Sequence, residues 1–275
     1  MNYLSLMVHL ELERPNTGLL EIAGQLAERF HAHVIGIAAC QPMRMVYGGS
    51  YVSLELAEQD REEIGEEMRD AEAEFRSALL NRVKSVEWRS SATFASIADY
   101  LATQSRSADL IITGVASGEL FDAARALNMG DLVMHAGRPV LIVPNTTDTL
   151  RLDNVVIGWK ETRETRRAVF DALPLLRNAA QVTVIEIARE VDLAEASIRL
   201  ADVVGWLRRH GVDAGFLASP STGDDIARLN LIAQEHNADL IVAGAYGHRR
   251  LHDWTLGGVT GDLLLSANRC ALVSH

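Results

Sequence analysis

The sequence contains two similar eight-residue stretches, SADLIITG at residues 107–114 and NADLIVAG at residues 237–244. Each copy runs from an Ala-Asp pair through a short apolar segment to a glycine, which predicts a buried strand followed by a turn. A second match, Gly-Asp-Leu, follows at 130–132 and at 261–263, and the copies keep step as far as Leu141 and Leu272. The offset is 130 residues at the first match and 131 at the second. A repeat of this length indicates two copies of one domain.

The segments around these matches alternate between apolar strands and amphipathic helices. Strands are predicted at 3–10, 33–39, 86–90, 110–113 and 140–143, and again at 154–159, 181–187, 214–218, 240–243 and 271–274. Such alternation is typical of right-handed crossovers in a doubly wound parallel sheet. We therefore predict an α/β protein of two repeated doubly wound domains, residues 1–147 and 148–275. Each has a five-stranded parallel sheet flanked by helices, and the two pack as an intrachain pseudo-dimer.

The composition narrows the classes of function. Hydrophobic residues make up 48% of the 275 residues, which is enough for two cores, and the formal net charge is -11. A negative charge of this size argues against a nucleic-acid partner and against an anionic membrane surface. Cys40 and Cys270 are far apart and are predicted to be buried free thiols. With no signal peptide or spanning segment in the pattern, we expect a cytoplasmic protein.

The chemistry is predicted at the turn after the second copy of the repeated strand, GAYGHRRLHDWTLGGVTG at residues 244–261. Gly244 and Gly247 would let the backbone approach a ligand closely. Gly257 and Gly258 would open the next helix, whose first amides form a site for an anion. A hydroxyl from Thr260 and a guanidinium from Arg249 or Arg250 would add to a phosphate site.

The spacing Gly-x2-Gly-x9-Gly, formed by Gly244, Gly247 and Gly257, resembles the ATP-binding motif of the universal stress protein family. The resemblance implies that this loop wraps the triphosphate and ribose, while adenine lies against the ends of the first, second and fourth strands. Carried over by position, it implies a nucleotide site made of Gly158, Trp159, Lys160, Ala243, Gly244, Tyr246, Gly247, His248, Arg249, Gly257, Gly258, Val259 and Thr260.

The chain departs from the family pattern at two positions of this site. Lys160 stands where the family often has Asp, and Gly258 stands where its motif continues with Ser or Thr. The first half departs further, because Ser117 replaces the second glycine and residues 126–127 are Ala-Leu instead of Gly-Gly. Glu119 and Asp122 also add negative charge to its loop. We therefore expect a degenerate N-terminal site and one nucleotide per chain.

These features predict an ATP-binding stress-response sensor or regulator, with ATP as the ligand and Mg²⁺ as its companion ion. An unidentified protein partner and a homodimer are further expectations. Two alternatives stay open: a non-enzymatic protein-interaction module with both nucleotide sites empty, and a slow ATPase. For the ATPase, only His248, His252 and Asp253 are candidate bases, so we do not expect an efficient enzyme. No dedicated metal site is predicted, because His248 and His252 lack a third ligand.

Overall fold

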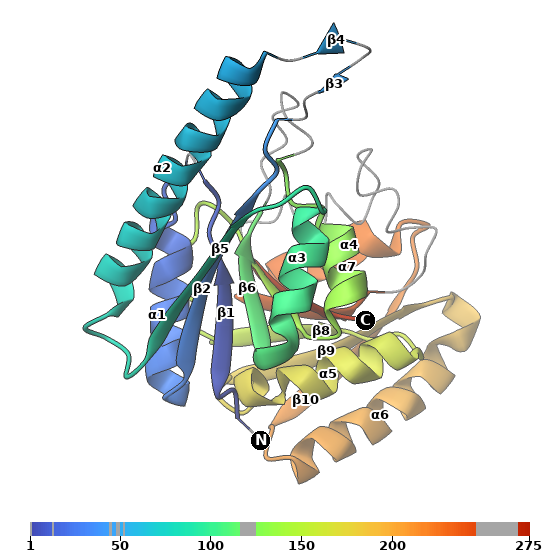
Figure 1. Ribbon diagram of the computed structural model, residues 1–275. Coiled ribbons are helices and arrows are strands. Elements are labelled where there is room, and N and C mark those ends of the chain that lie inside the picture. Colours follow the sequence, from blue (N-terminus) through green and yellow to red (C-terminus); the bar gives the residue numbers. More distant parts are fainter. Residues whose placement is uncertain are drawn as a thin grey trace.

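A computed structural model describes residues 2–12, 14–43, 46–47, 50–51, 53–115, 125–245 and 269–275. Figure 1 shows helices on both sides of a strongly twisted sheet. The helices are α1 Thr17–Phe30, α2 Leu54–Leu79, α3 Ile97–Gln104, α4 Met129–Ala136, α5 Arg163–Leu176, α6 Leu193–Arg209 and α7 Asp225–Glu235. The strands are β1 Ser5–His9, β2 His33–Cys40, β3 Val46–Tyr47, β4 Ser50–Tyr51, β5 Val86–Ala92, β6 Leu110–Gly114, β7 Val140–Val143, β8 Asn154–Gly158, β9 Gln181–Ala188, β10 Ala214–Pro220, β11 Leu240–Gly244 and β12 Cys270–Ser274.

Ten of these strands form one sheet with the order β10-β9-β8-β11-β12-β7-β6-β1-β2-β5. Within this sheet, all strand pairs of each half are parallel, and the pair of β7 with β12 is antiparallel. The halves therefore have the same internal order and meet at their fifth strands. This confirms two repeated doubly wound units that form an intrachain pseudo-dimer. The short hairpin of β3 and β4 lies outside this sheet and was not predicted.

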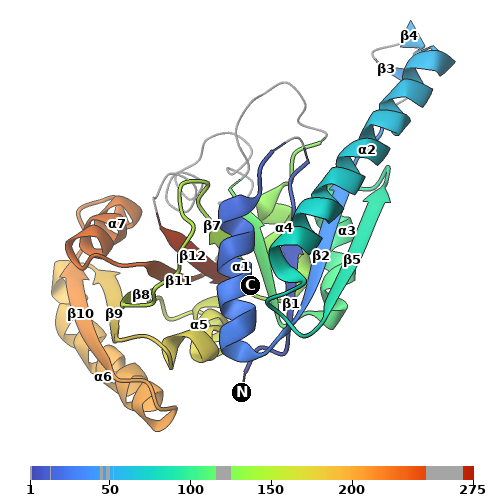
Figure 2. The ribbon, with the colours of Figure 1, turned by 90° about the vertical axis from the view of Figure 1, so that its left-hand side faces the viewer.

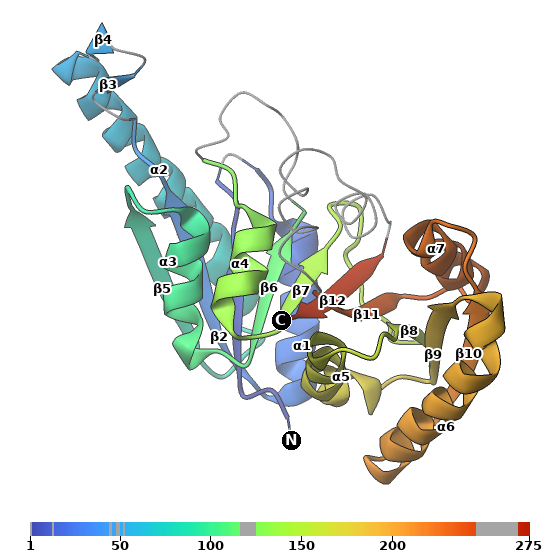
Figure 3. The ribbon, with the colours of Figure 1, turned by 90° about the vertical axis from the view of Figure 1, so that its right-hand side faces the viewer.

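The junction between the halves has the symmetry of a two-fold axis. Leu141 and Leu272, which are equivalent in the sequence repeat, are direct partners in the register of β7 and β12. On either side, Ile142 pairs with Ala271 and Val140 pairs with Val273, so each pair exchanges equivalent positions of the two copies. A contact of this kind is isologous, as between the subunits of a symmetric dimer. Figure 3 shows the two strands side by side in the middle of the molecule.

The core is continuous across the two halves on one face of the sheet. One cluster of buried apolar residues includes Leu20 of α1 and Phe75 of α2 together with Val169 of α5 and Leu200 of α6. Two further clusters lie under α3 with α4 and under α7. Figure 2 shows α1 lying against the sheet, close to α5, with α2 extending away beside it. Because apolar residues from both halves share one cluster, burial stabilises the halves together.

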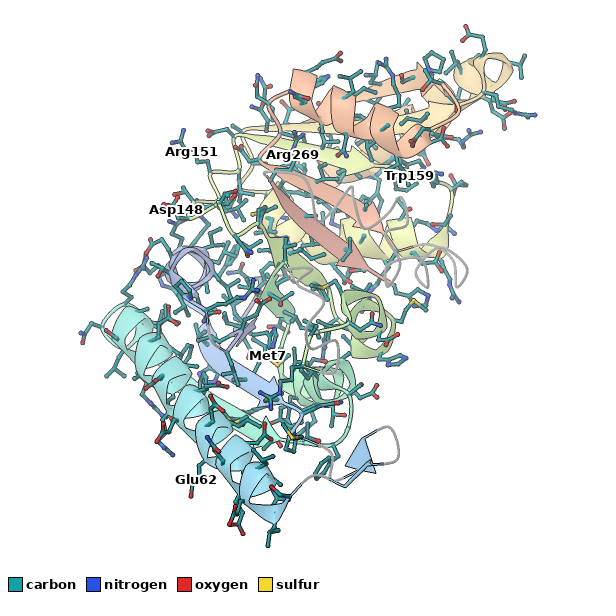
Figure 4. All side chains as sticks on the ribbon, turned by 90° about the horizontal axis from the view of Figure 1, so that it is seen from above. Met7, Glu62, Asp148, Arg151, Trp159 and Arg269 are labelled. Carbon is teal, nitrogen blue, oxygen red and sulfur yellow. The ribbon has the colours of Figure 1, made fainter. Side chains whose placement is uncertain are left out.

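The connection between β7 and β8 packs against α1. The side chain of Gln25 donates to the carbonyl of Asp148 and accepts from the amide of Leu150, each at 3.4 Å. The boundary predicted between residues 147 and 148 falls in this connection. Asp148 and Arg151 are labelled in Figure 4, where they lie between the two halves.

Two further sequence expectations bear on the described residues. Cys40 and Cys270 are both buried, and burial raises the pKa of the Cys270 thiol to about 12. Among the described residues, no helix has both the length and the apolar character needed to cross a bilayer.

Candidate functional site

The ends of β8 and β11 meet where the strand order of the second half reverses. β8 lies between β9 and β11, and the chain leaves it toward β9 by way of α5. In register, Gly158 at the end of β8 pairs with Ala243 of β11 and with Ile185 of β9. A crevice at such a switch point is the usual ligand site of open α/β sheets. The structure thus brings together Gly158 and Ala243, two residues of the predicted nucleotide site, at one edge of the sheet.

The end of β11 approaches the start of α5 very closely. A Cβ atom added at Gly244 would lie 2.4 Å from the amide nitrogen of Thr165 and 2.5 Å from the carbonyl carbon of Glu164. Both neighbours are backbone atoms, so a side chain does not fit unless the helix moves. Gly244 is therefore required by the packing of strand on helix, in addition to any role in ligand binding.

The first turn of α5 lies directly after β8 and carries a hydroxyl cap. Thr162 is the N-cap, and its side chain accepts a hydrogen bond from the amide of Thr165 at 3.2 Å. In the same turn Glu164 is buried. Burial opposes ionisation of Glu164, but hydrogen bonds from Arg163 and from its own amide hold its pKa below the ordinary value. The turn therefore presents a carboxylate that is already hydrogen-bonded and paired with Arg163.

Lys160 lies at the edge of this crevice and reaches toward α7. Its ammonium nitrogen is 3.6 Å from a carboxylate oxygen of Asp225, the first residue of that helix, and its side chain is half exposed. An exposed ion pair of this kind is weak, about 1 kcal/mol or less. The ammonium group can therefore exchange Asp225 for another anion at little cost.

The side chain of Trp159 turns away from this edge into the interior. Its residue is only 6% exposed and belongs to the core cluster shared by α1 and α5. Its amide donates to the carbonyl of Ile185 at 2.7 Å, which continues the pairing of β8 with β9. Figure 4 labels Trp159 in the C-terminal half. Trp159 therefore contributes only its backbone to the strand ends. Its indole packs in the core, on the face of the sheet that α1 and α5 cover.

The rest of the predicted nucleotide loop lies outside the described residues. This applies to Tyr246, Gly247, His248, Arg249, Gly257, Gly258, Val259 and Thr260, and also to the candidate bases His252 and Asp253. The described chain reaches Ala245, whose amide donates to the carbonyl of Ser274 at 2.8 Å, and resumes at Arg269. In the first half, Ser117, Glu119 and Asp122 likewise lie outside the described residues.

A polar hollow beside the crevice was missed by the sequence analysis. It has a volume of about 460 Å³ and lies over the ends of β9 and β10, with Glu186, Ser221 and Asp225 in its wall. Glu186 is buried and accepts from Arg199 at 2.6 Å, and this hydrogen bond raises the pKa of the guanidinium. The signal was present, because Glu186 interrupts the otherwise apolar end of the strand VTVIEIA, and a buried charge requires a partner.

The equivalent edge of the first half is closed by side chains. His9 pairs in register with Thr113, and Thr113 is the repeat equivalent of Ala243, so His9 stands where the second half has Gly158. Both side chains are buried, with 3.1 Å between Nδ1 of His9 and Oγ1 of Thr113. Burial lowers the pKa of His9 to about 4. Two residues further on, Glu11 takes the place of Lys160, and burial raises its pKa although Arg14 opposes the shift.

No family model and no curated protein matches the sequence. A solved universal stress protein from Archaeoglobus fulgidus aligns over 98% of this chain and 95% of its own, with a TM-score of 0.75 and 14% identity. A structure described as a putative universal stress protein from Pseudomonas aeruginosa aligns over 99% of this chain and 93% of its own, with a TM-score of 0.59 and 16% identity.

A third full-length neighbour has a different setting. The cytoplasmic domain of a prokaryotic cation chloride cotransporter aligns over 98% of this chain and 94% of its own, with a TM-score of 0.54 and 11% identity. At these identities the likeness establishes the fold, and a fold of this kind serves more than one function. The resemblance inferred from the glycine spacing is thus confirmed over the whole length of the chain at the level of the fold. The chain has the universal stress protein fold, present twice and joined through its fifth strands.

Proposed function

We propose that the chain binds one adenine nucleotide, ATP, at the switch point of its C-terminal half and acts as a stress-response sensor or regulator. The observation that supports this proposal most strongly is the difference between the two switch points. The paired strand ends Gly158 and Ala243 are partly exposed, whereas the equivalent His9 and Thr113 are 3% and 0% exposed. One edge therefore keeps its backbone partly exposed, whereas the other is filled by its own side chains.

The charges of the two edges support the same assignment. Lys160 supplies an ammonium group to the C-terminal edge, whereas Glu11 supplies a carboxyl group to the equivalent place in the first half. A triphosphate favours the first arrangement and is repelled by the second. The glycines of residues 244–261 and the helix start expected after them would complete the phosphate site.

Metal coordination differs from what the family resemblance would imply. Lys160 replaces the expected Asp, so this position holds no carboxylate for a cation. Within the described part of the chain, no group of three or more His, Cys, Asp or Glu side chains is placed to hold a metal ion. We propose that any Mg²⁺ arrives with the nucleotide, bound to its phosphates.

The alternative is an interaction module with both sites empty. It is favoured by the ion pair of Lys160 with Asp225, which occupies the ammonium group without a ligand. The occurrence of this fold in a transporter's cytoplasmic domain shows that the architecture also serves other roles. Mass spectrometry of the natively purified protein separates the two, because a bound nucleotide is expected only on the first proposal.

Calorimetric titration with ATP and AMP tests the site directly. We expect ATP to bind and AMP to bind more weakly, because AMP lacks the phosphates that the loop would hold. Equal affinities for ATP and AMP would show that the loop does not bind the additional phosphates. No heat of binding at millimolar ATP would refute the proposed nucleotide site. Gly257→Asp places a carboxylate where phosphate is expected and should abolish ATP binding. The matched control is Ala126→Asp at the equivalent position of the first half, which should bind ATP normally.

Slow hydrolysis is a separate question with its own readout. If the chain releases phosphate from ATP, the release should fall with His248→Ala or Asp253→Asn while ATP affinity is kept. Absence of phosphate release in the wild type would leave the sensor role and remove the ATPase alternative.

A further inference from the structure

A groove separates α5 from α6 on the outer side of the C-terminal half. It has a volume of about 390 Å³, which lies within the usual range for small-molecule sites. Val169 and Phe170 come from α5, Val203 and Trp206 come from α6, and Trp159 comes from the end of β8. The two helices can be followed side by side in Figure 1. The groove is distinct from the crevice between β8 and β11, because it lies between two helices on one face of the sheet and the crevice lies at the ends of the strands.

Three aromatic side chains form part of the walls of this groove. Of the four Trp in the chain two, Trp159 and Trp206, line it, and Phe170 adds a third ring. Phe170 is 41% exposed, which is unusual for a phenylalanine in a helix that packs on a core. Trp206 is held in place by His210, with ring centroids 4.2 Å apart. Walls of this kind select a flat, apolar group.

Two buried nitrogen donors in the wall lack an acceptor. Nε1 of Trp159 and Nε of Arg199 are both buried without a hydrogen-bond partner among the described residues. Trp159 itself is more than nine-tenths buried. Buried donors are nearly always satisfied in folded proteins, so these two N–H groups mark a wall whose hydrogen bonding is incomplete.

One guanidinium group of the wall can take an anionic acceptor. Three guanidinium groups, those of Arg166, Arg199 and Arg209, line the groove together with two carboxylates, those of Glu161 and Asp202. Arg166 pairs with Glu161, and Arg199 pairs with Glu186 and Glu195. No ion pair to Arg209 is found within the described residues, so its guanidinium is available.

We propose that the groove between α5 and α6 is a second binding site, for a small planar aromatic carboxylate. The ring would lie between Phe170 and Trp206, and a carboxylate oxygen would accept from the guanidinium of Arg209. The flat ring matches the aromatic side chains of the wall. The negative charge matches the guanidinium group that has no ion pair within the described residues.

Calorimetry with three probes tests this specificity on the full chain. 2-Naphthoate has both the ring and the carboxylate, 2-naphthalenemethanol has the ring alone, and cyclohexanecarboxylate has the carboxylate alone. We expect 2-naphthoate to bind about tenfold more tightly than either of the others. Equal binding of 2-naphthalenemethanol would reduce the site to an apolar groove, and no heat from 2-naphthoate at millimolar concentration would overturn the proposal.

A pair of variants on α6 locates the binding. Val203→Trp fills the groove and should abolish binding of 2-naphthoate. Ile198→Trp makes a similar change on the same helix at a side chain that is 73% exposed, and it should bind like the wild type. Undiminished binding by a folded Val203→Trp chain would refute the assignment. If Val203→Trp does not fold, Arg209→Met serves in its place and should weaken 2-naphthoate without affecting 2-naphthalenemethanol.

The proposal for this site can be tested separately from the proposal for the nucleotide site. ATP should not displace 2-naphthoate, and Gly257→Asp should bind 2-naphthoate with unchanged affinity. Competition between ATP and 2-naphthoate would mean that the aromatic probe occupies the nucleotide crevice. The proposal that the groove binds it would then be wrong.

Discussion

Asp239 repeats in the second half the two hydrogen bonds that Asp109 makes in the first. An oxygen of Asp109 accepts from the amides of Leu4 and Ser5 at 2.7 and 3.0 Å, and an oxygen of Asp239 accepts from those of Asp153 and Asn154 at 2.7 and 2.9 Å. Each carboxylate thus holds the start of the first strand against the start of the fourth. The Ala-Asp pair that precedes both repeated strands has a structural purpose, which explains why it occurs twice.

Removing either carboxylate should destabilise the fold by a similar amount. Asp239→Ala leaves two strand-start amides without their acceptor, and we expect a loss of about 1–3 kcal/mol in the free energy of unfolding. Asp109→Ala should behave alike. Urea unfolding measures both, with Asp213→Ala, an exposed aspartate, as a control expected to change stability by about 0.5 kcal/mol or less. A large effect in one half alone would show that the two contacts are not equivalent.

The repeated glycines at the ends of β6 and β11 should respond differently to the same substitution. Gly244→Ala forces a Cβ against the backbone of α5 at 2.4 Å, whereas at Gly114 the nearest atom is 3.6 Å away. We expect Gly244→Ala to destabilise the chain by about 1–3 kcal/mol. Gly114→Ala should be close to neutral. Thermal unfolding of the pair compares them, and equal losses would contradict the close approach of α5.

The chain has only two lysines, which makes the role of Lys160 simple to isolate. If its ammonium group leaves Asp225 for phosphate, Lys160→Ala should weaken ATP about fivefold, equivalent to about 1 kcal/mol. The effect should shrink at high salt, because the group is half exposed. Lys84→Ala, which removes the other lysine, should leave ATP affinity unchanged. An unaltered affinity in Lys160→Ala would place the phosphates elsewhere.

The buried imidazole of His9 should make stability depend on pH. Its pKa is lowered by burial from 6.5 to about 4. Between these two pH values the imidazole is therefore protonated in the unfolded chain and neutral in the folded chain. Stability from this group is fully present above pH 6.5 and is lost as the pH falls toward 4. The total change is about 3 kcal/mol.

Urea unfolding at pH 7 and at pH 5 measures this loss. In His9→Asn the side chain no longer titrates, so the variant should lose less stability than the wild type between the two values. His236→Asn, which removes an exposed imidazole, should follow the wild type. Identical losses in wild type and His9→Asn would show that His9 is protonated in the folded state.

Much of the fold could be predicted from the sequence, because repetition and periodicity report on it directly. The strands around 110–114 and 240–244 are apolar runs with turn signals, and they appear as β6 and β11. The register of β7 against β12 could not be predicted, since short apolar strands such as Val140–Val143 specify burial and do not specify a partner. The hairpin of β3 and β4 was missed for a related reason, because two-residue strands carry no periodic signal.

The candidate site was predictable only in part. Gly158 and Ala243 meet because parallel strands end at one edge of a sheet, which follows from topology alone. The inward course of Trp159 and the ion pair of Glu186 with Arg199 depend on packing between helices and strands far apart in sequence. Such contacts leave only indirect signals, such as a charge within an apolar run.

The ladder between β7 and β12 also bears on how the chain folds as it is synthesised. When the first half has left the ribosome, Leu141 already has β6 beside it, but its other edge is open. That edge is closed only when Leu272 emerges, after every helix and strand of α5 to β11. An uncovered apolar edge is a hazard during this interval, since it pairs readily with other chains. Pairing within the chain is then favoured over pairing with another chain, because the covalent link between the halves keeps β12 at high local concentration near β7.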